Sequence, residues 1–135
     1  MSTRPNRRMI EAATVIEQID DASRRTVRAL SGRSFVGGMT ARPRSEVTYN
    51  LETPAAFLVG YVGLDPVRGR SGHCQIRVTG ADGGELYAET LDTPRQIHRM
   101  AIPIGNTREL SLITDFGQRG EIGDVVNWCE LILVR

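Results

Sequence analysis

Several side chains in this sequence have the chemistry to hold a polyhydroxylated ligand. Most are planar hydrogen-bonding groups that suit hydroxyls, and one is the only Trp, whose ring could cover the apolar face of a pyranose. They are Arg42, Asp65, Asp115, Asp124, Asn127 and Trp128. In a β-sandwich such groups gather on loops at one end. We therefore treat this set as the candidate ligand-binding residues.

Most of these residues also have a structural interpretation. Trp128 stands at the junction between a loop and the final expected strand, where burial in the core is the favoured interpretation. Asp124 and Asn127 could instead cap backbone amides of their loop, as short polar side chains often do. Arg42 could form an ion pair with Asp65 or Asp124, and an exposed pair of that kind contributes only ~0–1 kcal/mol.

Other kinds of chemistry find little support in the sequence. The two histidines, His73 and His98, fall on different expected strands. Cys74 follows His73 but takes the inward position where His73 points outward, so the sequence sets no nucleophile against either histidine. Asp115 and Asp124 could form a carboxylate pair, but nothing fixes the separation that glycoside hydrolysis needs. The spacing of His, Cys, Asp and Glu suits neither zinc nor a calcium loop, and no phosphate-binding glycine loop is present. We therefore expect no catalytic residues, no metal site and no cofactor, although a calcium ion held by loop carboxylates and carbonyls stays open.

Composition indicates one globular domain. The chain has 135 residues, 40% of them hydrophobic, and no apolar run approaches the ~20 residues that span a bilayer. Residues 1–44 carry nine Arg against four acidic residues, whereas residues 45–135 carry eight Arg against twelve. This asymmetry could mark a face for an anionic partner, although a solvated surface is the favoured interpretation. Because Phe35 is the only ring in the basic region, we expect no nucleic-acid partner.

The first 25 residues form a basic leader before the domain at residues 26–135. Apolar residues three or four apart from Met9 to about Arg24 favour a helix, although a strand could start at Thr14. Acidic residues interrupt the stretch that would be apolar in a secretory signal. We expect a cytoplasmic chain or a piece of a longer secreted protein, and the leader could contact a protein partner or a second copy.

The two cysteines, Cys74 and Cys129, are too few for a disulfide framework and lack metal-site spacing. Both fall on inward positions of expected strands, where a free cysteine behaves as a small apolar residue. We expect two buried free thiols, although a single disulfide between them stays open.

Residues 26–135 show the two-residue alternation of short β-strands. Turn signals such as Asp82-Gly83-Gly84 separate the strands every ~8–12 residues, and no helical segment of ~10–15 residues lies between them. The expected strands are 26–30, 34–36, 46–51, 57–64, 73–79, 85–90, 96–104, 109–114 and 127–135. This pattern predicts an all-β antiparallel sandwich or barrel and argues against a parallel α/β sheet.

The chain is organised around its final expected strand, which is apolar on both faces. Strict alternation divides it into one face with Trp128, Ile132 and Val134 and another with Cys129, Leu131 and Leu133. A half-exposed strand would alternate polar and apolar residues. We therefore expect this strand to be buried on both sides, as in the centre of a sandwich.

Six segments occur in an order that is known from one protein family. They are Gly38-Met39 through Ser45, Val47-Thr48-Tyr49-Asn50-Leu51, Val62-Gly63-Leu64-Asp65, Asp82-Gly83 with Leu86-Tyr87, Arg108-Glu109-Leu110-Ser111-Leu112, and Asp124 ahead of Asn127-Trp128. Taken together they resemble the NPCBM/NEW2 family of carbohydrate-binding modules. The resemblance implies a galactose-binding-like β-sandwich of jelly-roll type, usually appended to glycoside hydrolases and other extracellular proteins, with a glycan as its partner.

Two positions differ from the family pattern. The family often has His where this chain has Arg42, and a second His where it has Val125. Either His could hydrogen-bond a sugar hydroxyl. Two functions therefore stay open, because a fold does not determine a function. One is a non-catalytic carbohydrate-binding module that recognises glycans through loops at one end. The other is a protein-interaction or assembly module on the same scaffold.

Overall fold

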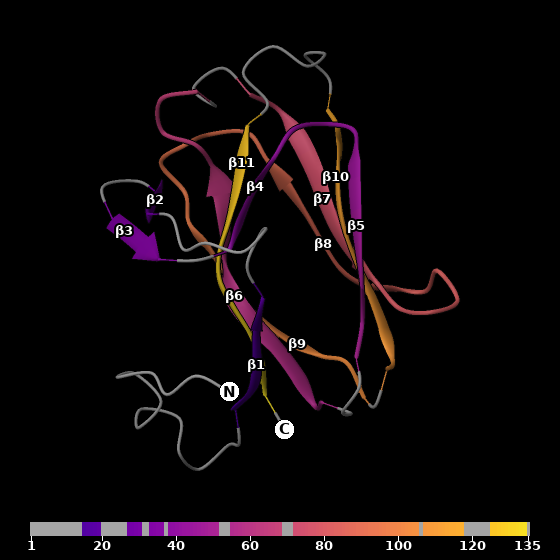
Figure 1. Ribbon diagram of the computed structural model, residues 1–135. Coiled ribbons are helices and arrows are strands. Elements are labelled where there is room, and N and C mark those ends of the chain that lie inside the picture. The colour runs from indigo at the N-terminus through magenta and orange to yellow at the C-terminus, as the bar shows by residue number, and fades with distance from the viewer. Residues whose placement is uncertain are drawn as a thin grey trace.

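The computed structural model describes residues 15–19, 27–30, 33–36, 38–51, 55–68, 72–105, 107–117 and 125–134. Within these residues the chain forms eleven β-strands (Figure 1). They are β1 (Val15–Ile19), β2 (Val27–Leu30), β3 (Arg33–Val36), β4 (Met39–Ala41), β5 (Ser45–Asn50), β6 (Phe57–Leu64), β7 (Cys74–Thr79), β8 (Glu85–Leu91), β9 (His98–Pro103), β10 (Glu109–Phe116) and β11 (Val126–Val134). The described part of the chain contains no helix that could cross a membrane.

Two antiparallel sheets face each other and enclose the core (Figure 1). The first sheet has the order β1-β11-β6-β9. Because β6 occupies one side of β11 along most of its length, β4 and β1 share the other side, beside its start and its end. The second sheet has the order β5-β10-β7-β8, and β2 pairs with β3 as a separate hairpin. The antiparallel sandwich expected from the alternation is confirmed.

The alternation of the sequence explains which side chains fill the core. In β5, Val47 and Tyr49 pack against the core, whereas Thr48 between them is exposed. In β9, Met100 is buried and Ala101 is exposed. Burial of a large apolar side chain contributes roughly 1.5–3 kcal/mol. A slip of one residue would turn a whole apolar set toward solvent, so this pattern determines the register of the strands.

Strand β11 is buried on both faces, as its sequence predicts. One face belongs to the core between the sheets. The other contacts the β2–β3 hairpin, and there Leu30 packs with Cys129 and with Tyr61 of β6. Cys74 lies in the main core instead, and both thiols are free and buried. The prediction of two buried free thiols is confirmed.

A β-bulge changes how the two faces of β11 are divided. Trp128 and Leu131 both lie in the main core, although strict alternation puts them on opposite faces. Between Cys129 and Ile132, β11 has one residue more than the stretch of β6 that pairs with it. Glu130 in this bulge has a φ of 49°, a left-handed conformation that glycine adopts more easily. The bulge reverses the alternation, so the expected grouping of Trp128 with Ile132 is wrong.

Part of the expected leader is a strand, which corrects the favoured helix. Val15–Ile19 form β1 and pair with the end of β11. This is the alternative that a strand starting near Thr14 allows. The other residues of the expected helix, 9–14 and 20–24, lie outside the described residues. The spacing of apolar residues three or four apart favours a helix. Such local spacing carries no information about pairing with a strand more than a hundred residues away, which is what makes this segment a strand.

Candidate functional site

Three strand ends meet at one end of the sandwich, at the top of Figure 1. In the first sheet the end of β4, the start of β11 and the end of β6 are paired side by side. Arg42 follows β4, Asp65 follows β6 and Val125 precedes β11, and the N–H of Asp65 donates to the carbonyl of Val125 at 2.8 Å. The structure therefore brings Arg42 and Asp65 to the same end. Asp124 lies outside the described residues.

Asp65 is the centre of a hydrogen-bond network that joins these strand ends. Its Oδ1 accepts from the backbone N–H groups of Val67 at 2.9 Å and Arg68 at 2.8 Å. Its Oδ2 accepts from Asn127 Nδ2 at 3.0 Å and from Arg68 Nη2 at 3.1 Å. Asn127 is fully buried, and its Oδ1 accepts from the Thr40 hydroxyl at 2.9 Å. The network ties β4, β11 and the turn after β6 together.

This network keeps the Asp65 carboxyl ionised. Burial alone would raise its pKa, but the hydrogen bonds from Arg68, Val67 and Asn127 outweigh burial and lower the pKa from 3.8 to about 2. Asp65 is only 7% exposed and both of its oxygens already accept hydrogen bonds. Asp65 and Asn127 therefore shape the turn and the strand ends. The residue that caps backbone amides in this network is Asp65, whereas the sequence suggested that role for Asp124 and Asn127.

Trp128 lies in the core and is not accessible to a ligand. Its ring is fully buried in the cluster between the two sheets. Its Nε1 donates to the hydroxyl of Thr114 on β10 at 3.2 Å, which satisfies the one polar atom of the ring and links the two sheets. Of the two interpretations of Trp128, the one as a core residue is therefore correct, and the ring is not a platform for a sugar.

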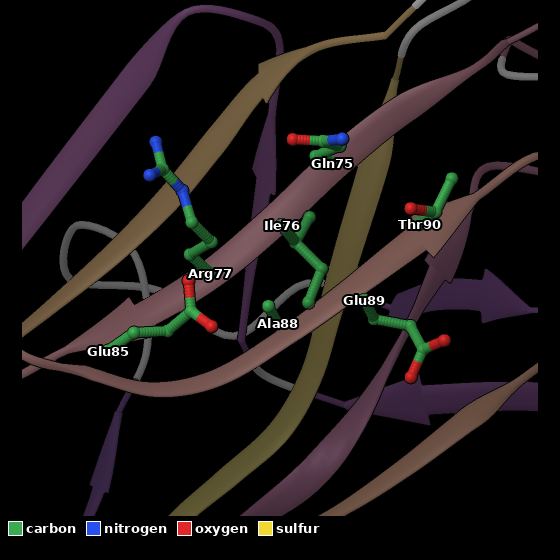
Figure 2. Close-up of a pocket in the computed structure, with 7 residues that line it drawn as sticks. All are labelled: Gln75, Ile76, Arg77, Glu85, Ala88, Glu89 and Thr90. Atoms are coloured by element: carbon green, nitrogen blue, oxygen red, sulfur yellow. The ribbon is translucent and has the colours of Figure 1, made fainter.

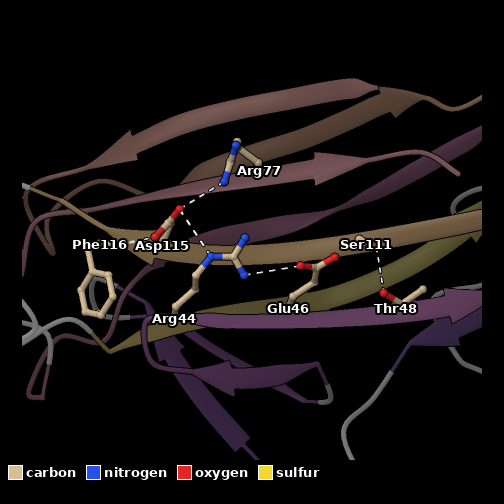
Figure 3. A network of polar contacts seen from close by, with 7 residues as sticks. All are labelled: Arg44, Glu46, Thr48, Arg77, Ser111, Asp115 and Phe116. Atoms are coloured by element: carbon tan, nitrogen blue, oxygen red, sulfur yellow. Dashed lines mark hydrogen bonds and ion pairs between the residues drawn. The ribbon is translucent and has the colours of Figure 1, made fainter. Parts of the chain in front are cut away.

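Asp115 lies on the outer face of the second sheet and not on a loop, because β10 extends past the expected strand to Phe116 (Figure 3). Asp115 Oδ2 accepts from Arg77 Nη2 on β7 at 3.1 Å and lies 3.7 Å from Arg44 Nε. Arg44 Nη1 also lies 3.4 Å from Glu46 Oε1. Asp115 Oδ1 accepts from the N–H of Phe116 at 2.8 Å. A chain of alternating charges thus crosses three strands close to the candidate end.

The same end carries several exposed groups, of which only Arg42 was identified from the sequence. Phe116 is 43% exposed at the end of β10, and Val67 in the turn after β6 is 75% exposed. Arg42 and Arg44 are exposed between β4 and β5. An exposed ring with guanidinium groups nearby is the combination first assigned to Trp128 and Arg42. Phe116 carries the same sequence signal as Trp128, since both stand where a strand meets the glycine-rich segment between them.

The two histidines lie apart in the fold. His73 precedes β7, whereas His98 begins β9. His98 Nδ1 lies 3.8 Å from Glu89 Oε1, and the Tyr87 hydroxyl donates to the same oxygen at 3.3 Å. Burial and the neighbouring Glu89 carboxylate raise the pKa of Tyr87 to about 12. Among the residues that the structure describes, no group of three or more His, Cys, Asp or Glu side chains could hold a metal ion.

Several solved structures share this fold. CBM51-2 of Clostridium perfringens ZmpB, in complex with GlcNAc, has a TM-score of 0.72 and 18% identity, covering 93% of this chain and 31% of that one. CBM51 of Clostridium perfringens GH95, in complex with methyl-galactose, has a TM-score of 0.66 and 20% identity, covering 90% of this chain and 91% of that one. The tandem CBM51 modules of Streptococcus pneumoniae Sp3GH98 have a TM-score of 0.65 and 14% identity, covering 90% and 45%. This chain thus spans about a third of the ZmpB chain.

Comparison of the sequence with known families supports the same fold. No curated protein sequence matches the chain. The sequence profile of the NPCBM/NEW2 domain matches residues 10–134, which is nearly the whole of it. The match covers every strand from β1 to β11, and it confirms the resemblance inferred from the six ordered segments. This chain belongs to the NPCBM/NEW2 domain family.

Proposed function

We propose that this domain is a non-catalytic carbohydrate-binding module that recognises a glycan at the end of the sandwich around Arg42 and Phe116. The observation that carries the proposal is the NPCBM/NEW2 profile match over residues 10–134. Two modules of similar fold were solved in complex with GlcNAc and with methyl-galactose. Neutral hexoses and N-acetylhexosamines are therefore the ligand class that we propose.

The exposed side chains at this end supply the contacts that a sugar needs. Phe116 offers a ring face for the apolar side of a pyranose, and Arg42 and Arg44 offer planar donors for its hydroxyls. Asp115, held between Arg44 and Arg77, offers a carboxylate that accepts hydrogen bonds. This set replaces the earlier one built on Trp128, which is buried.

The buried members of the first candidate set, Asp65, Asn127 and Trp128, stabilise the strands that carry this surface. The hydrogen bonds of Asp65 and Asn127 hold the ends of β4, β6 and β11 in one arrangement. Trp128 anchors β11 to β10 through Thr114. Because these strand ends are already ordered, binding at this end costs less conformational entropy than it would on a mobile loop.

NMR titration of the whole ¹⁵N-labelled domain with methyl-galactoside and N-acetylglucosamine tests the proposal. We expect the amide signals of Arg42, Arg44 and Phe116 to shift, with a Kd on the order of 1 mM, equivalent to about 4 kcal/mol of binding free energy. Phe116→Ala should abolish most of this binding because it removes the exposed ring.

Phe57→Ala is the matched control, because Phe57 is also 43% exposed but lies at the start of β6, at the opposite end of the sandwich. It should leave the affinity unchanged. The proposal is wrong if neither sugar shifts any amide of the folded domain. It is also wrong if Phe57→Ala weakens binding as much as Phe116→Ala does.

A protein-interaction or assembly module remains the second candidate. Val125, at one of the positions where the family often has histidine, is 1% exposed and offers no polar group to a sugar. Phe57, Val67 and Phe116 are exposed large hydrophobic residues that a protein partner could cover. Light scattering over a concentration series tests this alternative. A strict monomer whose amides respond to sugar speaks against it.

A further inference from the structure

A hollow of about 410 Å³ lies on the outer face of the second sheet, over strands β7 and β8 (Figure 2). It is lined by Gln75, Ile76, Arg77, Glu85, Ala88, Glu89 and Thr90. The set of residues proposed above for the end of the sandwich shares no member with this lining. The hollow is therefore a separate feature of the molecule.

The register of β7 and β8 explains why the hollow exists. Outward-facing residues pair across the two strands, Gln75 with Thr90 and Arg77 with Ala88. Arg77 Nη2 donates to Asp115 on β10 at 3.1 Å, and β10 lies on the side of β7 away from β8. The guanidinium group therefore leans away from Ala88, whose methyl group fills little of the space that remains. The surface of the sheet stays open here, because the long Arg77 side chain is turned aside and the Ala88 side chain opposite it is small.

The walls of the hollow match the two needs of a pyranose ring. Ala88 and the aliphatic stem of Arg77 form an apolar floor (Figure 2). The amide of Gln75 and the hydroxyl of Thr90 stand toward one end of this floor, and the carboxylate of Glu85 stands toward the other. Small-molecule sites of ~300–1,000 Å³ typically combine an apolar surface with a few polar groups of this kind.

The charges around the hollow restrict the ligand that it suits. Glu85 supplies the acidic side chain on this face, because Glu89 pairs with the buried Ile76 and turns its carboxylate to Tyr87 and His98 on the other face. The one cation of the lining, Arg77, is already paired with Asp115. The rim is therefore negative on balance. A carboxylate or phosphate ligand would be repelled here, whereas the hydroxyls of a neutral sugar can donate to the acidic oxygens.

We propose that this hollow is a second subsite that holds one neutral pyranose unit of a glycan. The apolar face of the ring lies on Ala88, and its hydroxyls bond to Gln75, Thr90 and Glu85. This inference rests on the proposed glycan-binding function and extends it to a second surface. The ion pairs of Asp115 with Arg77 and Arg44 connect the hollow to the candidate end (Figure 3).

The test uses the same titration of the whole domain, with glucuronate added as an anionic comparison. We expect methyl-galactoside or N-acetylglucosamine to shift the amides of Gln75, Ala88 and Thr90, and glucuronate to bind there at least about tenfold more weakly. Ala88→Phe fills the hollow and should abolish these shifts, while the shift of Phe116 stays as in the wild type.

Ala101→Phe is the matched control, because Ala101 is also an exposed alanine on an edge strand, β9 of the first sheet. It should leave both sets of shifts unchanged. Thr90→Ala provides a second test if the Phe variant does not fold, and it should weaken binding at the hollow at least about threefold by removing one hydroxyl contact.

The outcomes separate the two proposals. Shifts confined to Arg42, Arg44 and Phe116 would overturn the second subsite and leave the proposed function standing. Equal binding of glucuronate and the neutral sugars at the hollow would overturn its proposed preference. A lack of any sugar-dependent shift in the folded domain would overturn the proposed function and the subsite with it.

Discussion

Replacing Asp65 with Asn should remove a pH dependence from the stability of the domain. The pKa of Asp65 is lowered from 3.8 to about 2 in the folded state. Because the folded pKa lies below the unfolded one, the ionised carboxylate stabilises the fold at neutral pH. This stabilisation is lost as the pH falls from about 5 to about 2, and the difference in pKa corresponds to about 2 kcal/mol. Asn has no proton to bind, so the variant loses nothing from this position on acidification.

At neutral pH the same substitution should lower the free energy of unfolding. The new amide would bring an N–H donor toward Asn127 Nδ2 and Arg68 Nη2, which now donate to Asp65 Oδ2 at 3.0 and 3.1 Å. Breaking a buried charged pair typically costs about 3–5 kcal/mol. Arg68 is 56% exposed and water can solvate it again, so we expect a smaller loss, of about 2–3 kcal/mol.

Urea unfolding of the wild type and of Asp65→Asn, measured at pH 7 and at pH 2.5, provides the assay. The difference in unfolding free energy between the two proteins should shrink by about 1.5 kcal/mol at the lower pH. Asp92→Asn, at an exposed position, is the control and should stay within about 0.5 kcal/mol of the wild type at both pH values. A difference for Asp65→Asn that does not change with pH would refute the proposed role of its hydrogen bonds.

Three further predictions concern packing and the thiols. A Cβ added at Gly38 would collide with the carbonyl oxygen of Trp128, whereas one added at Gly83 would meet nothing within 4 Å. Because both glycines have positive φ, Gly83→Ala should cost about 1 kcal/mol in urea unfolding and Gly38→Ala at least about 3 kcal/mol; equal losses would contradict the collision. Trp128→Phe should lower the unfolding free energy by about 1–3 kcal/mol, by cavity formation and loss of the Nε1 hydrogen bond, and a neutral result would argue against a core position. Cys74 and Cys129 should react with a thiol reagent only after unfolding, and fast labelling of the native protein would contradict their burial.

The strands could be predicted from the sequence because inward positions in a sandwich are apolar. The expected strand at 57–64 coincides with β6, and the one at 127–135 differs from β11 by one residue at each end. The bulge at Glu130 could not be predicted, since a glutamate gives no local sign of a left-handed conformation. Its backbone is determined by strands that pair with β11 on both sides, and these are distant in the sequence.

Only part of the arrangement around the candidate residues could be predicted from the sequence. Asp65 follows the expected strand 57–64, so the sequence locates that strand end, whereas β4, which precedes Arg42, is not among the expected strands. The side-by-side ends of β4 and β6 depend on their pairing with β11, which is distant in the sequence. Sequence alone could not show that Trp128 is buried and Phe116 exposed. The alternation does not say which of the two strand-to-loop junctions is covered by the opposite sheet. The contact between Asp115 and Arg77 spans 38 residues and depends on the register of β10 and β7.

Strand β11 is the last described strand of the chain and lies inside the first sheet, between other strands. This position affects when the sheet can form during synthesis. Its residues complete ladders with β1, β4 and β6, and the outermost of these pairs joins Val15 to Val134. During synthesis, the first sheet therefore stays unpaired along its middle until nearly the whole domain has left the ribosome. Closing such long loops is slow, so folding on the millisecond-to-second scale that is common for high contact order is expected. Until then the exposed edge of β6 is a site where nascent chains can aggregate.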